Sequence, residues 1–192
     1  YNTMDTIIWL IEAEKTQEAV EMVSSLSAFF RHSLSRGKDI ITLREEQEHV
    51  CSYLQIQQVR YKDIMQYTVN IDPALQDAVL PKLTLQPLVE NALYHGVKLK
   101  RGLGHIYVTG RGEGDEILLQ VTDDGVGIPP EWLAQLTRSI EQGERVGFGL
   151  STVHERVQLF FGPSYGLSIS SQPGAGTTIS IRIPWRKETT AP

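Results

Sequence analysis

Four short segments of this chain combine residue types and spacings that suit the binding of a nucleotide. The first is LQPLVENALYHG at residues 85–96, in which polar side chains interrupt an apolar helical pattern. The second is DDGVGIP at 123–129, and the third is GFGL at 147–150, where a helix is expected to begin. The fourth is GAGTT at 174–178, which leads into an alternating apolar run. Each segment alone is a weak signal, but the four in this order predict a nucleotide site.

Two of these segments place a polar side chain at the end of a predicted strand. Asp123 continues the inward face of one alternating run, and Thr177 opens the inward face of another. The apolar residues on these two faces are Ile117, Leu119, Val121, Ile179, Ile181 and Ile183. A buried carboxylate is costly without a partner. The amino group of adenine is a suitable donor to Asp123, and the Thr177 hydroxyl can join directly or through water. The alternative is an aspartate that caps a strand end or a turn, and the glycines that follow it weaken that alternative.

The glycines predict a backbone that approaches its ligand closely. Gly125 and Gly127 can take positive φ and let a base come near, although a plain surface turn is the alternative. Gly147 and Gly149 precede Leu150 at a predicted helix start, where free amides and the helix dipole favour phosphate. The polar stretch from about 129 to 146 is expected to be mobile and to close over the phosphates as a lid.

A helix predicted over about 82–96 carries the remaining candidates. Asn91, His95 and Lys98 fall at i, i+4 and i+7 on one polar stripe, apart from the core face. The residues predicted for the core face are Leu85, Leu88, Val89 and Ala92. The Asn91 oxygen suits Mg²⁺, a hard cation that remains bound to phosphates. His95 and Lys98 can contact phosphate or ribose, although a solvated or core histidine is the more common role for a residue such as His95. Pro87 should kink this helix or mark its first turn.

Length, charge and cysteine content limit the class of protein. The 192 residues are enough to bury a core in one domain or two small ones. The net charge of -5 argues against non-specific binding of nucleic acid, which requires a basic surface. Cys51 is the only cysteine, so no internal disulfide can form, which fits a reducing compartment. The apolar run at 7–11 is far shorter than the roughly 18 residues of a membrane span, and no signal peptide is visible.

Hydrophobic periodicity divides the chain into two parts. Residues 1–64 repeat apolar side chains at intervals of three and four, which predicts helices. Thr42 and Glu45 form the capping box that should start a new helix. The apolar positions before that box that share helix faces include Met4, Ile8, Ile11, Val20, Val23, Phe30 and Leu34.

From residue 66 the period changes to two, which predicts five strands with helices over about 82–96 and 149–161. We therefore expect an α+β fold, in which a helical hairpin or bundle precedes an α/β sandwich with helices on one face of a mixed sheet. The predicted divisions are a helical segment at 1–64, a nucleotide-binding domain at 65–186 and a tail at 187–192.

The motifs resemble the ATP-binding fold shared by gyrase B, MutL and the histidine kinases, and most specifically the catalytic domain of sensor histidine kinases. The helical part resembles the dimerisation segment of the LytS-type subgroup, because YNTM at 1–4 is similar to the end of its HFLYNTL motif. Further similar stretches are LSAFFR at 26–31, LREE at 43–46, YL at 53–54 and VRY at 59–61. The resemblance covers essentially the whole chain. It implies that Asn91 is the magnesium ligand, that Asp123 contacts adenine, and that the two Gly-x-Gly elements form the nucleotide loops.

The resemblance further implies a cytoplasmic kinase core whose parent protein is anchored in a membrane. Such a protein transfers the γ-phosphoryl group of ATP to a histidine, usually as a homodimer, and then to an aspartate of a response regulator receiver domain. The acceptor histidine is expected three residues before Tyr1, outside this chain, because His32 and His49 occupy ordinary helix positions. Glu90 is a weak catalytic candidate. Tyr94 stands where related kinases often carry a Lys that contacts phosphate.

Two other functions remain open at this point. The first is an ATP-driven conformational ATPase of the gyrase or MutL type, in which a general base activates water. That base lies one turn before the Asn in such proteins, where this chain has Pro87. The second is a non-catalytic scaffold that keeps the fold without binding nucleotide, which the intact Asn91, Asp123 and glycine motifs argue against.

Overall fold

The computed structural model describes residues 1–34, 37–144 and 149–186. The helices are α1 (Asn2–Glu12), α2 (Thr16–Leu34), α3 (Leu43–Arg60), α4 (Gln86–Asn91), α5 (Pro130–Glu141) and α6 (Leu150–Phe161). The strands are β1 (Ile40–Thr42), β2 (Met65–Ile71), β3 (Val79–Pro81), β4 (Gly104–Glu113), β5 (Glu116–Asp123), β6 (Gly166–Gln172) and β7 (Gly176–Pro184). Short helical turns are η2 (Pro73–Leu75), η3 (Ala92–Gly96) and η4 (Val97–Leu99).

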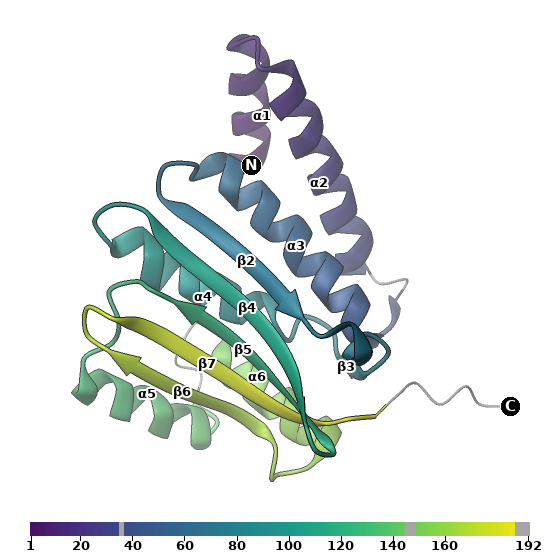
Figure 1. The fold of residues 1–192 in the computed structure, drawn as a ribbon, viewed down its shortest axis with the longest axis vertical. Helices are drawn as coiled ribbons and strands as arrows, with labels where there is room; N and C mark the ends of the chain where they lie inside the picture. Colours follow the sequence, from purple (N-terminus) through teal and green to yellow (C-terminus); the bar gives the residue numbers. More distant parts are fainter. Residues whose placement is uncertain (35–36, 145–148, 187–192) are drawn as a thin grey trace, which may run out of the picture.

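The main sheet has the order β2-β4-β5-β7-β6 among the described strands. Strand β2 pairs with β4 in parallel, and the other neighbours pair antiparallel, so the sheet is mixed as predicted. Helices α4, α5 and α6 lie behind this sheet, on one face (Figure 1). The predicted fold class is therefore confirmed. The alternation of apolar residues accounts for it, because every second side chain of the central strands lies in the core under the helices.

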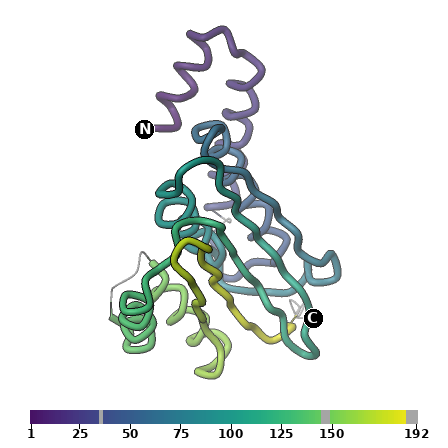
Figure 2. The backbone as a smooth tube through the Cα atoms, turned by 60° about the vertical axis from the view of Figure 1, so that its left-hand side comes forward, coloured from purple at the N-terminus to yellow at the C-terminus, as the bar shows by residue number. Residues whose placement is uncertain are grey.

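Helix α3 connects the two parts of the chain. Helices α1 and α2 project beyond the sheet, whereas α3 lies alongside it (Figures 1 and 2). Leu43, Val50 and Leu54 of α3 belong to the main core, while Ile56 joins the smaller cluster formed with α1 and α2. The predicted capping box starts α3, with the Thr42 amide donating to Glu45 at 2.8 Å. None of the helices in the described ranges is both long and apolar enough to cross a membrane.

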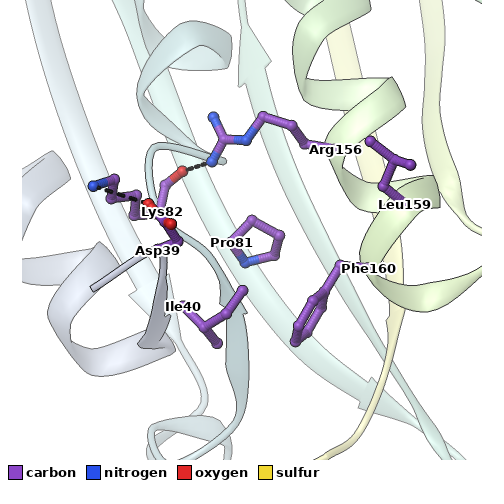
Figure 3. A pocket seen from close by; sticks show the side chains of 7 residues that line it. All are labelled: Asp39, Ile40, Pro81, Lys82, Arg156, Leu159 and Phe160. Carbon is purple, nitrogen blue, oxygen red and sulfur yellow. Dashed lines mark hydrogen bonds and ion pairs between the residues drawn. The ribbon is translucent and has the colours of Figure 1, made fainter. Parts of the chain in front are cut away.

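Two features between the predicted elements were missed. Strand β1, at Ile40–Thr42, pairs antiparallel with β3 and lies next to α6 across a cavity of about 310 Å³. In that cavity Lys82 forms an ion pair with Asp39 at 3.3 Å, and the Arg156 guanidinium donates to the Lys82 carbonyl (Figure 3). The second feature is α5, which replaces most of the predicted mobile lid. Its apolar side chains recur at three and four, at Leu133, Leu136 and Ile140, and the last two pack against the main core, so the segment folds as a regular helix.

The helix predicted over 82–96 is shorter and less regular than expected. It begins at Gln86 with Pro87 in its first turn, which confirms one of the two roles predicted for that proline. It is α-helical only to Asn91, and Ala92–Gly96 form a wider π-type turn in which the Val97 amide reaches back to the Ala92 carbonyl. A turn of this kind inserts an extra residue, so the residues after it leave the helical phase of those before it.

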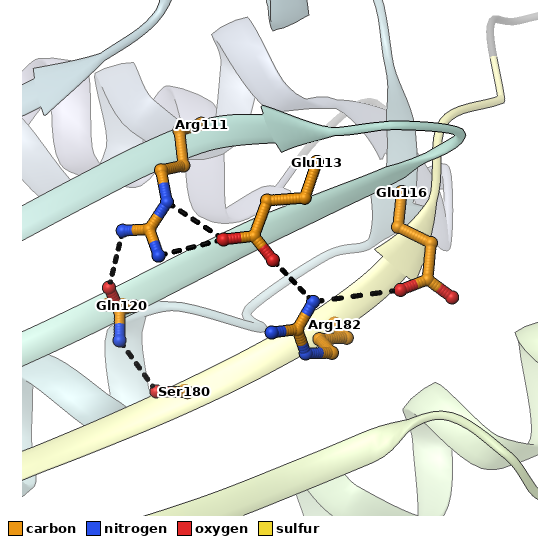
Figure 4. A network of polar contacts seen from close by, with 6 residues as sticks. All are labelled: Arg111, Glu113, Glu116, Gln120, Ser180 and Arg182. Atoms are coloured by element: carbon orange, nitrogen blue, oxygen red, sulfur yellow. Dashed lines mark hydrogen bonds and ion pairs between the residues drawn. The ribbon is translucent and has the colours of Figure 1, made fainter.

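The face of the sheet opposite the helices is polar. Arg111 of β4 and Arg182 of β7 both contact the Glu113 carboxylate, at 2.8 Å and 2.6 Å (Figure 4). Gln120 of β5 accepts from Arg111 and donates to Ser180. These side chains are solvent-accessible, and hydrogen bonds from Arg182 and Arg111 lower the pKa of Glu113. The network crosses three neighbouring strands and gives this face a hydrated surface.

Candidate nucleotide-binding site

Asp123 and Thr177 lie opposite each other on neighbouring strands at the end of the sheet. They are register partners in the β5–β7 pair, and their exposed fractions are 2% and 5%. Both side chains are therefore buried, as the period of two predicted. Oδ1 of Asp123 accepts from the Gly125 amide at 2.8 Å. Desolvation raises the pKa of Asp123 to about 6, against the lowering effect of the backbone amides of Gly125 and Thr177.

The backbone around Asp123 leaves no room for side chains. A Cβ atom at Gly96 would lie 2.3 Å from Oδ1 of Asp123, and one at Gly125 would lie 2.2 Å from the carbonyl carbon of Gly96. A Cβ at Gly176 would lie 1.8 Å from the Asp123 backbone oxygen. Gly127 has φ +69, and its Cβ would meet the Gln172 oxygen at 2.0 Å. Glycine is required at each of these positions, and together they form a floor of bare backbone packed closely against the buried carboxylate.

Hydrogen bonds join three of the sequence motifs around this floor. The Val126 amide donates to the Gly96 carbonyl at 3.4 Å, and the Gly174 amide donates to the Val126 carbonyl at 2.7 Å. Ser171 accepts from the Ile128 amide at 2.8 Å and contacts the Thr177 hydroxyl at 2.9 Å. The segments at 85–96, 123–129 and 174–178 thus form one surface.

The third motif lies beside the first. Gly149 has φ +83 and is the N-cap residue of α6, without a side-chain cap. A Cβ built on it would be 3.8 Å from Cβ of Pro87, so the starts of α6 and α4 are neighbours. Leu150 is fully buried, so its side chain belongs to the core and only its backbone is available to a ligand. Gly147 lies outside the described residues.

Asn91 is more buried than its predicted place on a polar stripe implies. Its exposed fraction is 7%, and its side-chain amide has no hydrogen-bond partner within the described part of the chain. An amide oxygen without a protein partner suits a ligand such as Mg²⁺, which usually takes one or two protein oxygens together with phosphates and water. The described residues contain no group of three or more His, Cys, Asp or Glu side chains that could hold a metal without such help.

The remaining candidates on this helix lie in different surroundings. His95 is partly exposed, and desolvation lowers its pKa. The Lys98 ammonium donates to the Tyr61 hydroxyl at 3.1 Å and lies over the rings of Tyr61 and Tyr94. The prediction that Lys98 shares a stripe with Asn91 assumed a regular α-helix. The π-type turn at Ala92–Gly96 lies between the two residues, so that assumption does not hold. The Glu90 carboxylate accepts from the Gln86 side chain at 2.7 Å.

Three site features were missed in the sequence. Gly96 and Gly176 stand within the motifs, but only their close approach to Asp123 shows why they must be glycine. Asp124 holds the loop in place, because it accepts from the His105 amide at 2.7 Å and pairs with Lys100 at 2.9 Å. The sequence shows an acidic residue next to Asp123, but it does not show that β4 supplies its hydrogen-bond donor.

Comparisons with known proteins agree with this geometry. The model of the family described as histidine kinase-, DNA gyrase B-, and HSP90-like ATPase matches residues 76–187, and that described as histidine kinase matches residues 1–65. The sensor histidine kinase BtsS of Escherichia coli (strain K12) is 34% identical over 188 residues, which are 98% of this chain and 31% of BtsS. For the sensor histidine kinase YesM of Bacillus subtilis (strain 168) the identity is 35%, with the same shares. For the sensor protein LytS of that strain it is 31%, covering 97% of this chain and 32% of LytS.

Solved structures show the same fold. The histidine kinase domain of the Erythrobacter litoralis EL346 blue-light activated histidine kinase has a TM-score of 0.56 and 20% identity, with 91% of this chain and 83% of that chain covered. The histidine kinase ThkA, in complex with the response regulator protein TrrA, has a TM-score of 0.57 and 16% identity, with 98% and 59% covered.

Together, the fold and the site define a histidine kinase ATP-binding catalytic domain preceded by a helical segment. The chain belongs to the sensor histidine kinases of the LytS type, a group represented here by LytS, YesM and BtsS. It spans about a third of the length of these curated relatives.

Proposed function

We propose that this chain is the kinase core of a two-component sensor. It binds Mg-ATP and transfers the γ-phosphoryl group to a histidine outside residues 1–192, from which the group passes to an aspartate of a response regulator. The observation that carries this proposal is the buried Asp123 carboxylate beside a floor of glycines that admits no side chain. Membership of the sensor histidine kinases supports the same reaction.

The residues of the site have distinct roles in this proposal. Asp123 accepts a hydrogen bond from the adenine amino group, which gives its buried charge a partner. Asn91 holds Mg²⁺, which neutralises phosphate charge when it is bound. The free amides that follow Gly149 at the start of α6 bind phosphate. Phosphoryl transfer depends mainly on such positioning and charge neutralisation. His95 is proposed to contact ribose or phosphate. The Lys98 ammonium instead lies over the rings of Tyr61 and Tyr94.

The helical segment supports a second copy as partner. Helices α1 and α2 expose a row of large apolar side chains, namely Met4, Ile8, Ile11, Val20, Val23, Phe30 and Leu34. Exposed apolar rows at coiled-coil spacing are typical of helices that pack against another chain. We therefore propose that residues 1–64 form the homodimerisation and phosphotransfer segment and residues 65–186 the ATP-binding domain. The kinase ThkA, which shares the fold, was solved in complex with a response regulator protein, and this supports a receiver domain as the partner here.

The relatives are about three times as long as this chain. The rest of such a parent protein has room for a sensor, and we propose that it is anchored in a membrane with the present residues on the cytoplasmic side.

Calorimetric titration with ATP and GTP tests the adenine contact. ATP should bind at least tenfold more tightly than GTP, because loss of a hydrogen bond at a buried polar group costs roughly 1–3 kcal/mol. Asp123→Ala should weaken ATP by about tenfold for the same reason. Asp115→Ala, in the exposed β4–β5 turn, is the matched control and should bind as the wild type does. Equal affinity for ATP and GTP, or an unchanged Asp123→Ala variant, would contradict the assignment. Repeating the ATP titration with a chelator measures the contribution of Mg²⁺.

A further inference from the structure

A row of polar and aromatic side chains joins α3 to the helix that carries Asn91. We call it the α3–α4 row. On one side are His49, Tyr53 and Tyr61 of α3 and its C-cap; on the other are Gln86 and Glu90 of α4, Tyr94 of η3 and Lys98 of η4. His49 contacts Gln86 near one end, and Tyr61 contacts Lys98 near the other. The row therefore runs along the side of residues 86–98 that faces α3.

His49 is a deeply buried member of this row, and it also contacts α2. Its exposed fraction is 2%, and its ring stacks on Phe29 of α2 with centroids 4.7 Å apart and an interplanar angle of 22°. Nε2 contacts the Gln86 side-chain oxygen, while Nδ1 has no hydrogen-bond partner among residues 1–34, 37–144 and 149–186. Desolvation lowers the pKa of His49, against the raising effects of Gln86 and the Phe29 backbone, which favours the neutral ring at pH 7.

The two hydrogen bonds of Gln86 determine which nitrogen of the His49 ring carries the hydrogen. The Gln86 amide nitrogen donates to Glu90 at 2.7 Å, so the Gln86 oxygen must be the acceptor that faces His49. Nε2 of His49 therefore carries the hydrogen, and Nδ1 carries a lone pair. Two successive donations lead from His49 through Gln86 to the Glu90 carboxylate, and the next residue in the chain is Asn91.

Packing alone gives no reason for an imidazole at this position. A phenyl ring could stack on Phe29 without burying an unpartnered nitrogen, which costs free energy. What a phenyl ring cannot do is donate to Gln86. We propose that His49 is a positioning residue: through Gln86 it fixes the Glu90 carboxylate and the start of the Asn91 helix, and its contact with Phe29 makes that geometry depend on how α2 packs. This inference rests on the proposed kinase function for its catalytic consequence.

Two variants separate positioning from packing. His49→Phe keeps the ring on Phe29 but removes the donor, whereas His49→Gln loses the ring and places an amide donor near the former Nε2. In the present chain, NMR signals of the Gln86 side-chain amide and of the Glu90 and Asn91 backbone amides should shift in His49→Phe and stay close to wild type in His49→Gln. The matched control is Gln47→Met. This substitution, also on α3, removes the hydrogen bond that Gln47 accepts from Gln76. Thermal unfolding verifies that each variant is folded.

The catalytic consequence is measured in a chain extended upstream through the acceptor histidine. At saturating ATP, His49→Phe should lower the autophosphorylation rate about tenfold with little change in KM, the effect of one lost hydrogen bond in a buried polar network. His49→Gln should restore most of the rate. In a Glu90→Gln background, His49→Phe should cause no further loss, because its effect acts through Glu90.

Opposite results identify a packing role. If His49→Phe keeps the wild-type amide signals and rate while His49→Gln loses both, the ring and not the donor matters, and the proposal is overturned. If the two substitutions at 49 and 90 lower the rate multiplicatively, the route through Glu90 is overturned. A wild-type extended chain that takes no phosphoryl group would contradict the kinase function, and the amide signals would still decide the positioning role.

Discussion

Asp123 is an unusual residue because its carboxyl group is buried at the place where a ligand is expected. Its folded-state pKa of about 6 lies above the ordinary value of 3.8. A carboxyl group with a raised pKa favours folding in its protonated form. Its contribution to stability is therefore fully present below about pH 4 and is lost as the pH rises through about 6. Without nucleotide, the ionised group opposes folding at neutral pH.

This gives a prediction for unfolding by urea between pH 4 and pH 7. Relative to Asp123→Asn, the wild type should lose on the order of 2–3 kcal/mol of unfolding free energy over that range, because the pKa of Asp123 rises from 3.8 to about 6 on folding. Other groups that titrate in the range, such as Glu46, are common to both proteins and cancel in the difference. A difference between the two proteins that does not change with pH would show that Asp123 has an ordinary pKa.

At the residue level, the sequence was informative wherever the backbone period was regular. Asp123 and Thr177 could be placed inward because alternation in a strand has a fixed period of two. Asn91 and Lys98 could not be placed in the same way, because the π-type turn at Ala92–Gly96 changes the helical phase between them. That turn ends at Gly96, which packs closely against Asp123, a residue far away in the sequence.

At the level of elements, the start of α4 depends on a carboxylate from another helix. The N-cap residue of α4 makes no side-chain cap. Instead Glu46 of α3, which is fully buried, accepts from the amides of Leu83 at 2.9 Å and Leu85 at 2.7 Å. Desolvation nevertheless raises the pKa of Glu46 to about 7. Helix α3 therefore fixes where the nucleotide-binding helix begins.

We predict that removing this acceptor destabilises the protein. Glu46→Leu should lower the unfolding free energy at pH 7 by about 1–3 kcal/mol, because the buried amides of the loop lose their partner. Glu46→Gln should cost less, since one acceptor oxygen remains. Urea unfolding measures both, with Glu48→Gln, an exposed position on the same helix, as control. Equal stability of Glu46→Leu and wild type would show that these amides find other partners.

The two elements that were missed, β1 and α5, have weak periodic signals in the sequence. Strand β1 has only the residues Ile40–Thr42 and depends on pairing with β3, and no periodicity can be read from so short a segment. Helix α5 was taken for a lid because polar residues outnumber its apolar ones. The contacts of Leu136 and Ile140 with the core were nevertheless enough to fold it as a helix.

At the level of the whole molecule, the proposed reaction needs a nucleophile that this chain does not carry in its motif. His32 lies on α2 next to Glu48, and His49 is buried between α2 and α4. Neither arrangement presents an exposed imidazole to the floor beside Asp123. Nucleotide binding and phosphoryl acceptance are therefore expected to be separable.

We predict that the present chain binds ATP but takes no label from γ-labelled ATP. A chain extended upstream through the expected histidine should take the label, because a neutral imidazole is a competent nucleophile near pH 7. The product should be labile in acid and stable in alkali, as a phosphoramidate is. Strong labelling of the present chain, or an acid-stable product in the extended one, would refute the proposed acceptor.

The position of β7 in the sheet has a consequence for how the protein is made. This strand lies between β5 and β6, although it follows both in the chain. A ribosome adds about 5–20 residues per second, beginning at the N-terminus. One edge of β5 therefore remains unpaired until β7 has been synthesised. Thr177 arrives with that strand, opposite Asp123. On the proposed function, the ATP site of a nascent chain is therefore incomplete until β7 has been translated, so nucleotide binding would report that this strand has joined the sheet.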